Sequence, residues 1–234
     1  MNEIIEQIKK SKKVLLHCHP NPDPDSVGST SAMRLALEKM GKEVTHIKGD
    51  SKIPKSFEFP QIDKIVEKNI SEIDLNNFDT FMILDSGGVE MISAKYPVTF
   101  PDTLNTIVID HHASNKGYGK FNFIDPKYSS TALLVYDILI KMNVEIDHDI
   151  ALNLFMGIYS DTGGFRYGEN GARAIEIAYK LVSIAPDYQK TISIMENSNT
   201  KESLIFEGLL MNSVKTYFDG KFAIAYISNE DLVK

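Results

Sequence analysis

The sequence predicts an α/β protein: a parallel sheet with helices on both faces, followed by a linker helix and the start of a second α/β domain. Two observations favour the parallel sheet. Short apolar runs rich in Val, Ile, Leu and Phe are followed by longer helical patterns, and these runs lack the apolar–polar alternation of a half-exposed strand. Apolar strands separated by helices are typical of a parallel sheet that is covered on both sides.

The predicted elements follow in order along the chain. Residues 1–13 have the pattern of an amphipathic helix. Strands are expected at Val14–His19, Glu43–Lys48, Phe81–Asp85 and Thr106–Asp110. Helices are expected at Ser26–Met40, Ser130–Met142, Asp149–Tyr159 and Ala172–Ile184. In an open sheet of this kind, ligands bind at the carboxyl ends of the strands.

The pattern changes after residue 186, so residues 1–186 are expected to form the first domain. Residues 187–212 are polar and helical in character, which predicts a linker, and residues 213–234 predict the beginning of a second domain. Val214–Phe218 and Phe222–Ile227 flank Asp219-Gly220, and Asp-Gly between two apolar runs is typical of a β-hairpin. Because an isolated hairpin is only marginally stable, we expect a truncated domain in a piece of a longer protein.

Composition narrows the class of protein. The chain has 234 residues, of which 43% are hydrophobic and 9% aromatic, as in a soluble globular protein. Its formal net charge of −7 argues against binding to long duplex DNA. No apolar run could cross a membrane, the N-terminus lacks the apolar segment of a signal peptide, and Cys18 is the single cysteine. We therefore expect a cytoplasmic protein without a membrane partner, and a homodimer is left open.

Acidic and histidine residues gather where the apolar runs end. The first strand runs into HCHPNPDPD, FMILD and TIVID each end in Asp, two histidines follow the second of these, and Asp161 closes LFMGIYSD. Each feature alone is more typical of a turn or helix cap. If the strands are neighbours, however, six side chains converge in one crevice: His19, Asp23, Asp25, Asp85, His111 and Asp161.

Such a cluster needs cations. Four carboxylates close together repel one another, and two divalent ions would supply four positive charges. Imidazole and carboxylate ligands without a thiolate favour Mn²⁺ over structural zinc, with Mg²⁺ or Co²⁺ as alternatives. Two such ions activate water and stabilise both oxygens of a displacement at phosphorus. The sequence therefore predicts a metal-dependent phosphoesterase.

These residues resemble the DHH phosphoesterase family, named for the triplet that is Asp110-His111-His112 here. The resemblance covers about residues 13–170 and all four family motifs, in order. They are His19-x-x-x-Asp23-x-Asp25, Asp85 in ILDSGG, the namesake triplet, and Asp161 in GIYSDTGGF. In the family a second domain, DHHA1, presents a glycine-rich loop and an arginine to the substrate. The hairpin from Val214 resembles the beginning of that domain, but a Gly-Gly-Gly-His-like loop is absent from this sequence.

The resemblance implies a role for each motif residue. One metal would be held by His19, Asp23 and Asp85, and the other by Asp25, Asp85, His111 and Asp161. His112 would face the substrate as a catalytic residue and donate to a phosphate oxygen or to the leaving group. Asp110 would act beside it by orienting the histidines, with a simple strand terminator as the alternative.

DTGGFRY and PDPDSVGS are similar to the bacterial oligoribonuclease branch, which also dephosphorylates 3′-phosphoadenosine 5′-phosphate (pAp). This similarity implies Mn²⁺-dependent hydrolysis of short oligonucleotides (nanoRNA), of small nucleotide phosphates such as pAp, or of both. A cyclic di-AMP or linear pApA phosphodiesterase is the alternative within the family. A non-catalytic nucleotide-binding module is the alternative from another class.

Other residues could support the site. Arg166 could contact a phosphate, and Ser130 could bind phosphate at a helix N-terminus, with a surface arginine and a helix cap as the alternatives. His17 is expected to line or support the site, and Asn115 to support His111. His46 and His148 are expected at the surface without partners.

Overall fold

The computed structural model describes residues 1–54, 56–57, 59–197 and 200–229. The chain divides into two compact units, Met1–Ile192 and Ser193–Lys234. The predicted domain boundaries at residues 186 and 212 stay predictions, and residues 230–234 of the predicted second domain lie outside the described residues. Within the described ranges, no helix combines the length and the apolar character that are needed to cross a membrane.

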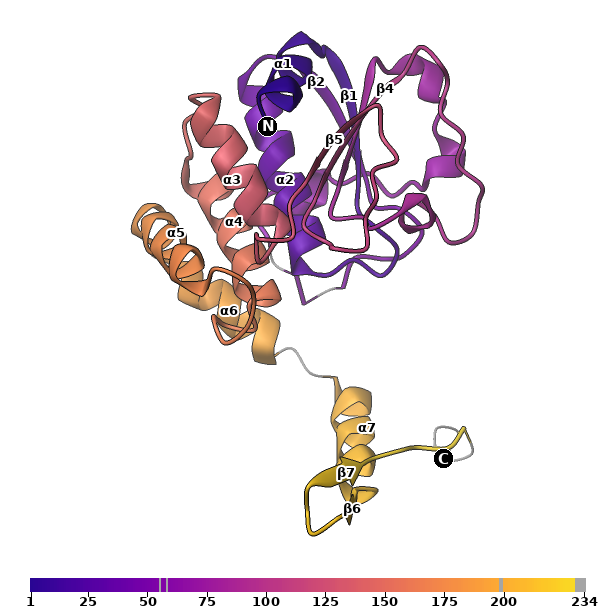
Figure 1. The fold of residues 1–234 in the computed structure, drawn as a ribbon, viewed down its shortest axis with the longest axis vertical. Coiled ribbons are helices and arrows are strands. Elements are labelled where there is room, and N and C mark those ends of the chain that lie inside the picture. The colour runs from indigo at the N-terminus through magenta and orange to yellow at the C-terminus, as the bar shows by residue number, and fades with distance from the viewer. Residues whose placement is uncertain (55, 58, 198–199, 230–234) are drawn as a thin grey trace. The chain divides into compact units, whose positions relative to one another are not determined.

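A five-stranded parallel sheet forms the centre of the first unit (Figure 1). The strand order is β2-β1-β3-β4-β5, and every neighbouring pair is parallel. The strands are β1 (Lys13–His17), β2 (Glu43–Ile47), β3 (Thr80–Leu84), β4 (Asn105–Asp110) and β5 (Phe121–Ile124). The predicted parallel sheet is confirmed. β5 was not predicted, because it is a short edge strand that is only partly buried and therefore lacks an apolar run.

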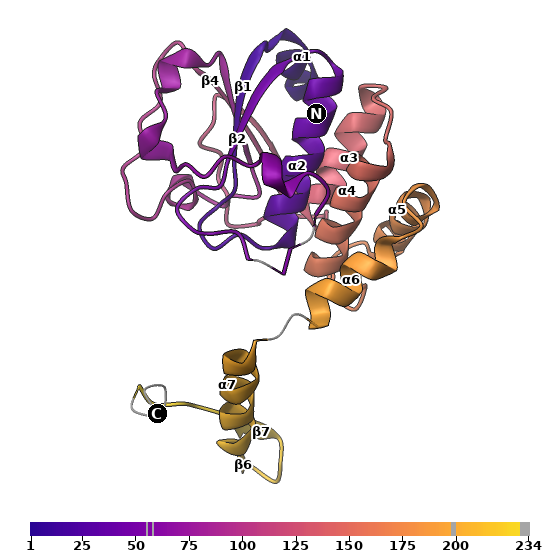
Figure 2. The same ribbon diagram turned by 180° about the vertical axis from the view of Figure 1, so that it is seen from behind.

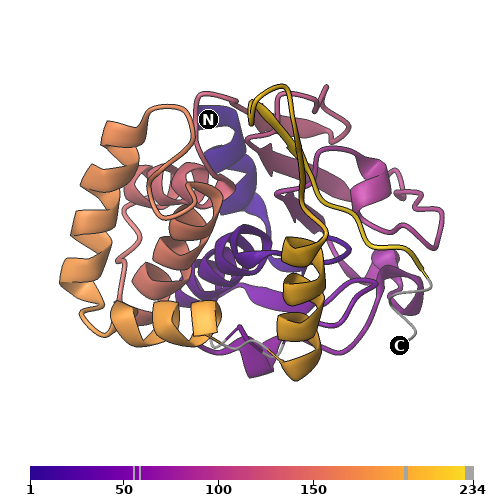
Figure 3. The ribbon, with the colours of Figure 1, turned by 90° about the horizontal axis from the view of Figure 1, so that it is seen from below.

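Three helices pack together on one side of the sheet (Figures 1 and 2). They are α2 (Pro24–Lys39), α3 (Thr131–Lys141) and α4 (His148–Asp161), and the chain begins with α1 (Asn2–Lys10). α2 contacts β1 and β3, and α3 contacts β4. α5 (Gly171–Ile184) packs on α4, on the side away from the sheet (Figure 3).

The opposite face of the sheet is covered by the segments between β2 and β4. They contain the short 3₁₀ helices η2 (Ile70–Glu72), η3 (Leu75–Asn77) and η4 (Val89–Met91), whereas η1 (Ile62–Lys64) follows Gln61, which bonds to Arg34 of α2 and Asp149 of α4. Ile70 and Ile92 of these segments pack in one cluster with Leu15, Phe81 and Val108 of the strands. Helices therefore cover both faces, with α-helices on one side and 3₁₀ helices on the other.

The second unit is small. It begins within α6 (Tyr188–Asn197) and contains α7 (Lys201–Asn212) and an antiparallel hairpin of β6 (Lys215–Tyr217) and β7 (Phe222–Ile224). Phe218, Asp219 and Gly220 have positive φ, as a tight hairpin turn requires, so the predicted hairpin is present. No described residue from 193 to 229 is buried. The described part of this unit therefore has no apolar core of its own.

Candidate metal centre

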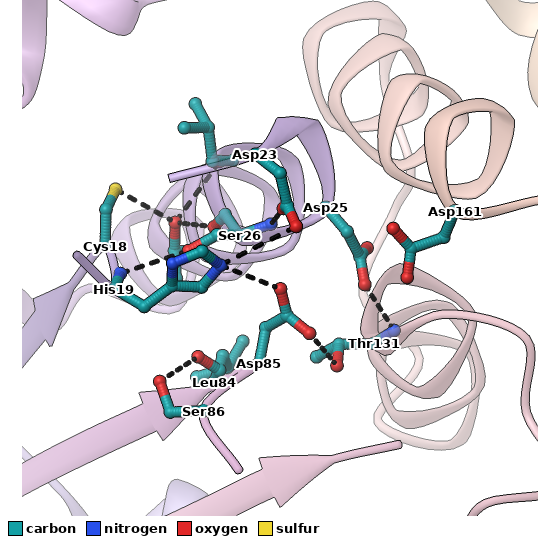
Figure 4. Close-up of polar contacts among 12 residues, drawn as sticks. Cys18, His19, Asp23, Asp25, Ser26, Leu84, Asp85, Ser86, Thr131 and Asp161 are labelled. Carbon is teal, nitrogen blue, oxygen red and sulfur yellow. Dashed lines mark hydrogen bonds and ion pairs between the residues drawn. The ribbon is translucent and has the colours of Figure 1, made fainter. Parts of the chain in front are cut away.

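The turn after β1 is held in place by hydrogen bonds that involve the predicted ligands. Asp23 caps α2, because its Oδ1 accepts the Ser26 N–H at 2.9 Å. The hydroxyl of Ser26 in turn accepts the backbone N–H of His19 at 3.2 Å. As a result, His19 in the turn, Asp23 at the N-cap and Asp25 in the first turn of α2 lie around a common space (Figure 4).

Asp85 lies at the centre of the site and follows β3 directly. Its φ of 53° lies in the left-handed region, which is uncommon for a residue other than glycine and is often found at functional sites. Its Oδ2 lies 3.6 Å from His19 Nε2, and its Oδ1 lies 3.6 Å from His111 Nε2. The Thr131 hydroxyl donates to Oδ1 at 3.0 Å. The two oxygens of Asp85 therefore face two different histidines.

Two further carboxylates come from helices. Asp25 is fully buried and accepts the N–H groups of Thr131 at 2.6 Å and Ala132 at 2.9 Å, at the N-terminus of α3. Asp161 lies 3.2 Å from His111 Nε2 through its Oδ2. The sequence interpretation grouped Asp161 with the strand ends, and this was wrong: LFMGIYSD belongs to α4, and Asp161 is the last residue of that helix.

Backbone carbonyls orient both histidines that face these carboxylates. His19 Nδ1 donates to the Pro20 carbonyl at 2.9 Å, and His111 Nδ1 to the Tyr128 carbonyl at 3.4 Å. A ring nitrogen that faces a carbonyl must carry a hydrogen, so each neutral ring presents the lone pair of Nε2 to the cluster. His111 Nε2 is buried and makes no hydrogen bond within the described residues. Both rings are therefore oriented as metal ligands would be.

The ligand atoms form overlapping groups. Atoms of His19, Asp23 and Asp85 lie within 4.8 Å of one another, and so do atoms of Asp25, His111 and Asp161. Asp85 also groups with His111 and His112 in the same way. Carboxylate oxygens and imidazole nitrogens suit Mn²⁺ or Mg²⁺, so the donor set fits the predicted ions. The structure thus brings all six predicted ligand residues together, and their role as ligands stays a prediction.

The electrostatics of the cluster also fit a cation. Burial, followed by the charges of Asp85 and Asp161, raises the pKa of Asp25 well above its usual range. Burial also raises the pKa of Asp161. Burial opposes a charge on His19, but contacts with Asp23 and Asp85 outweigh it and raise its pKa to about 10. Burial and mutual repulsion thus disfavour the charged form of these carboxylates, and bound cations would offset both effects.

His112 differs from His111 in its partners. Its Nδ1 lies 2.7 Å from Asp110 Oδ1, and this hydrogen bond raises the pKa of His112 to about 9. Asn115 Nδ2 donates to the other oxygen of Asp110 at 2.7 Å. Asn115 was predicted to support His111, whereas it supports the residue that holds His112. Half-exposed, His112 lines a cleft of about 420 Å³ together with His19, Asp85 and Glu90.

The remaining predicted residues lie outside the ligand groups. Ser130 is buried and caps α3, so its hydroxyl already has a partner within the helix. Arg166 is exposed, with its guanidinium 5.7 Å from the centre of the Tyr167 ring. His17 is fully buried, with its ring centre 5.3 Å from that of Phe81 in an edge-on contact. The substrate-binding or supporting roles of these three residues stay predictions.

Some residues of the site were missed by the sequence interpretation. Thr131 binds both Asp25 and Asp85, and the Tyr128 carbonyl orients His111. The only sequence signal for Thr131 was the run of hydroxyl residues Ser129-Ser130-Thr131 at the start of a predicted helix. The sequence interpretation gave the binding role in this run to Ser130. Glu90 lies on a 3₁₀ helix and was missed because nothing in SGGVEM distinguishes a cleft residue from an exposed loop residue.

His46 and His148 were predicted at the surface without partners; the surface position was wrong for His46 and right for His148, and both have partners. His46 is only 1% exposed, and its Nε2 lies 3.3 Å from the Sγ of buried Cys18. His148 is half-exposed, but its ring nitrogens contact Asp149 at 3.1 Å and Asp187 at 2.6 Å. A short strand with mixed polarity hid the burial of His46.

Comparison with known proteins identifies the family. Residues 13–158, more than half of the chain, match the DHH family, N-terminal domain. An uncharacterized protein from Methanocaldococcus jannaschii is 28% identical over 97% of this chain and 47% of its own length. The bifunctional oligoribonuclease and PAP phosphatase NrnA from Thermus thermophilus is 26% identical over 93% of this chain and 64% of its own length.

A solved structure shows the same fold. The exopolyphosphatase-related protein from Bacteroides fragilis superimposes with a TM-score of 0.84 over 99% of this chain and 71% of its own, at 22% identity. The chain spans about half of the first curated relative and just under two thirds of the second. On the family match and the shared fold, this chain belongs to the DHH family and contains its N-terminal domain.

Proposed function

We propose that this chain carries the catalytic domain of a Mn²⁺-dependent phosphoesterase, which hydrolyses short oligonucleotides, pAp, or both. The observation that carries the proposal is the position of Asp85. One of its oxygens faces His19 and the other faces His111, so it joins two ligand groups in one centre. A carboxylate shared in this way is what a two-metal site requires.

The six ligand residues divide between two ions. His19, Asp23 and Asp85 would hold one, and Asp25, Asp85, His111 and Asp161 would hold the other. When bound, two divalent ions lower the pKa of a coordinated water and stabilise charge on the phosphoryl oxygens. Thr131 and Ala132 keep the Asp25 carboxylate in place through backbone N–H groups, and Thr131 holds Asp85 through its hydroxyl.

His112 is the residue left to serve the substrate. Its Nδ1 is occupied by Asp110, which leaves Nε2 for a ligand in the cleft. The hydrogen bond to Asp110 raises the pKa of His112 to about 9, which favours the protonated ring. It can therefore donate from Nε2 to a phosphoryl oxygen or give a proton to the leaving oxygen. Asp110 stabilises the imidazolium, and Asn115 holds Asp110.

The substrate class is supported by the relatives. The proteins from Thermus thermophilus and, at 23% identity, from Bacillus subtilis are both named bifunctional oligoribonuclease and PAP phosphatase NrnA. A metal centre that neutralises the cluster would let an acidic chain bind a small anionic nucleotide, whereas a net charge of −7 disfavours long duplex DNA. Short single-stranded oligonucleotides and pAp fit both conditions, because they are small anions and are not long duplexes.

Metal analysis tests the centre itself. The chain is reconstituted with Mn²⁺ and freed of excess metal. Inductively coupled plasma mass spectrometry should then find about two ions per molecule. Asp85→Asn should lower the content to about one ion or less, because one group loses its oxygen to an amide nitrogen and both groups lose the negative charge that they share. Ser114→Ala, which changes a neighbour in the same cleft, is the matched control and should keep both ions. Folded wild-type protein that binds no Mn²⁺ would contradict the proposal.

A substrate panel tests the chemistry. Turnover of pAp, linear pApA, cyclic di-AMP and pyrophosphate should be measured with Mn²⁺ at saturation. We expect hydrolysis of pAp, of pApA, or of both, with loss of activity in Asp85→Asn. Preference for cyclic di-AMP would favour the cyclic-dinucleotide alternative. Metal-loaded protein that turns over none of the four would favour a non-catalytic binding module.

A further inference from the structure

A second cleft lies in the first unit and shares no lining residue with the cleft at the metal centre. Its volume is about 290 Å³. The loop that leads into α3 forms one wall, with Tyr128 and Ser129, and the start of α5 forms another, with Asn170 and Arg173. Neither the ligand set nor the proton donor His112 contributes to it, so its chemistry is separate from the hydrolysis proposed above.

The first feature of this cleft is the open N-terminus of α5. The preceding residue, Asn170, has a φ of 55° and its side chain does not cap the helix. The N–H groups of Arg173 and Ala174 both turn back to the Asn170 carbonyl. Among the contacts of the described residues, the N–H groups of Gly171 and Ala172 have no acceptor. Asn170 and Arg173 line the cleft, so the N-terminus of this 14-residue helix borders it, with two free N–H groups in the first turn and the positive end of the helix dipole.

The second feature is a buried hydroxyl without a partner. Ser129 lines the cleft and is only 6% exposed, and its Oγ makes no hydrogen bond within the described residues. Buried polar groups are normally paired, so an unpaired one needs an explanation. Because the hydroxyl hydrogen turns freely about the Cβ–Oγ bond, an oxygen of a ligand in the cleft would supply the missing partner.

The third feature is an arginine that is held by other side chains. Asp137 accepts from Arg173 Nη2 through one oxygen and from the Tyr128 hydroxyl, at 2.8 Å, through the other. The charge of Asp137 is thus used within the protein, while the remaining N–H groups of Arg173 are free to face a ligand. Of the other charged groups, Lys127 balances Asp125, so the helix terminus leaves the cleft with a positive bias.

We propose that this cleft binds a terminal phosphate group, either free as inorganic phosphate or carried by a nucleotide. Free helix N–H groups, a hydroxyl and a guanidinium fork are the donors that a tetrahedral oxyanion with several acceptors matches. A carboxylate ligand, which has only two oxygens, would accept from fewer of these donors. The site lies beside the loop whose Tyr128 carbonyl orients His111, but its occupancy does not require a metal or catalysis.

Amide NMR tests the proposal without relying on activity. The ¹⁵N-labelled chain, loaded with diamagnetic Mg²⁺, is titrated with inorganic phosphate at constant ionic strength, with sodium chloride as the control. We expect saturable shifts of the Gly171, Ala172 and Ser129 amides at millimolar phosphate. If these amides stay unmoved while signals near the metal centre shift, the second site does not exist. A parallel titration with AMP distinguishes a phosphate carried by a nucleotide from the free ion.

Variants make the test residue-specific. Arg173→Met should raise the dissociation constant at these amides at least tenfold, and Arg173→Lys should restore part of the loss. Ser129→Ala should weaken binding three- to tenfold and leaves the Arg173–Asp137 pair intact, so it serves even if Arg173→Met folds poorly. Lys180→Met makes the same change in charge on an exposed part of the same helix and should have no effect. Equal weakening by Lys180→Met would reduce the effect to general electrostatics and overturn the proposal.

Discussion

His111 and His112 are neighbours in the sequence, but the contacts of their rings assign them different chemistry. His111 donates through Nδ1 to a backbone carbonyl and directs Nε2 at the carboxylates of Asp85 and Asp161. His112 uses Nδ1 for Asp110 and keeps Nε2 for the cleft. The same ring therefore presents a lone pair at one position and a proton at the next.

Substitution of the two histidines should separate metal binding from catalysis. His111→Ala removes one of the proposed metal ligands and should lower bound Mn²⁺ by about one ion per chain. His112→Ala should leave the metal content unchanged and lower kcat by about 10²–10⁴-fold, because only a proton donor is lost. Metal content by elemental analysis and kcat on pApA check both expectations. Equal loss of metal in the two variants would contradict this division.

Burial of His46 makes stability depend on pH. Burial lowers the pKa of His46 to about 3, below the usual 6.5 of the unfolded chain. Below pH 6.5 the unfolded state therefore takes up a proton that the folded state does not, and stability falls as pH falls. Between pH 6 and 4.5, His46→Leu should remove about 1.4 kcal/mol per pH unit from the slope of the free energy of unfolding.

Denaturant unfolding at several pH values measures that slope. His148→Gln is the matched control, since contacts with Asp149 and Asp187 raise rather than lower the pKa of exposed His148. That variant should leave the acid slope unchanged. If His46→Leu unfolds with the wild-type slope, His46 is not kept neutral in the folded protein.

At the scale of secondary structure, the site depends on how closely α2, α3 and α4 approach one another. A Cβ on Gly28 of α2 would lie 2.4 Å from the Asn153 carbonyl oxygen of α4. A Cβ on Gly157 of α4 would lie 2.6 Å from Asp25 Oδ1 and 2.8 Å from Ala132 Cβ. Glycine at these two positions lets three helices meet around the Asp25 carboxylate.

Gly157→Ala tests this packing. At a solvent-exposed position of a helix, the substitution would raise the free energy of unfolding by about 1 kcal/mol through helix propensity. Here the methyl group meets Asp25 and Ala132, so we expect a loss of about 1–3 kcal/mol in the free energy of unfolding. Weaker Mn²⁺ binding should accompany it, since Asp25 must move. Gly208→Ala on α7, where a Cβ meets nothing within 4 Å, is the control and should cost no stability.

At the scale of the whole molecule, core and site belong to one unit. All six predicted ligands, His112 and the whole parallel sheet lie within Met1–Ile192. The described residues of the second unit are all at least partly exposed, including Phe206, Phe218 and Phe222. Folding and metal binding therefore depend on the first unit.

Deletion of residues 193–234 should therefore preserve the centre. The shortened chain should unfold within a few degrees of the full chain and still bind about two Mn²⁺ ions. Hydrolysis of a small activated phosphodiester should persist, because the reacting groups remain. If kcat/KM for pApA falls more than that for the small ester, the second unit contributes substrate contacts remote from the reacting phosphorus. Loss of folding or metal binding would contradict the assignment of both to the first unit.

The sequence alone determined the kind of sheet, four of its strands and the six residues that the structure brings together around Asp85. Apolar runs such as Leu15–Leu16 and Phe81–Leu84 carry their own signal, because a strand buried on both faces must be apolar throughout. His19, Asp23, Asp25, Asp85 and His111 were predictable because carboxyl ends of parallel strands meet at one edge. The match to the DHH family covers residues 13–158 and so includes these five residues.

The contacts between particular side-chain atoms were decided only by the tertiary structure. Asp161 reaches the site from the end of a helix, Asn115 supports Asp110 rather than His111, and Thr131 binds two carboxylates from distant parts of the chain. His46 is buried and the cleft beside Arg173 exists only where the loop before α3 meets α5. Local pattern specifies strands and helices, because it reflects backbone preference and burial. Contacts between residues far apart in sequence depend on the packing of whole elements, which no short segment records.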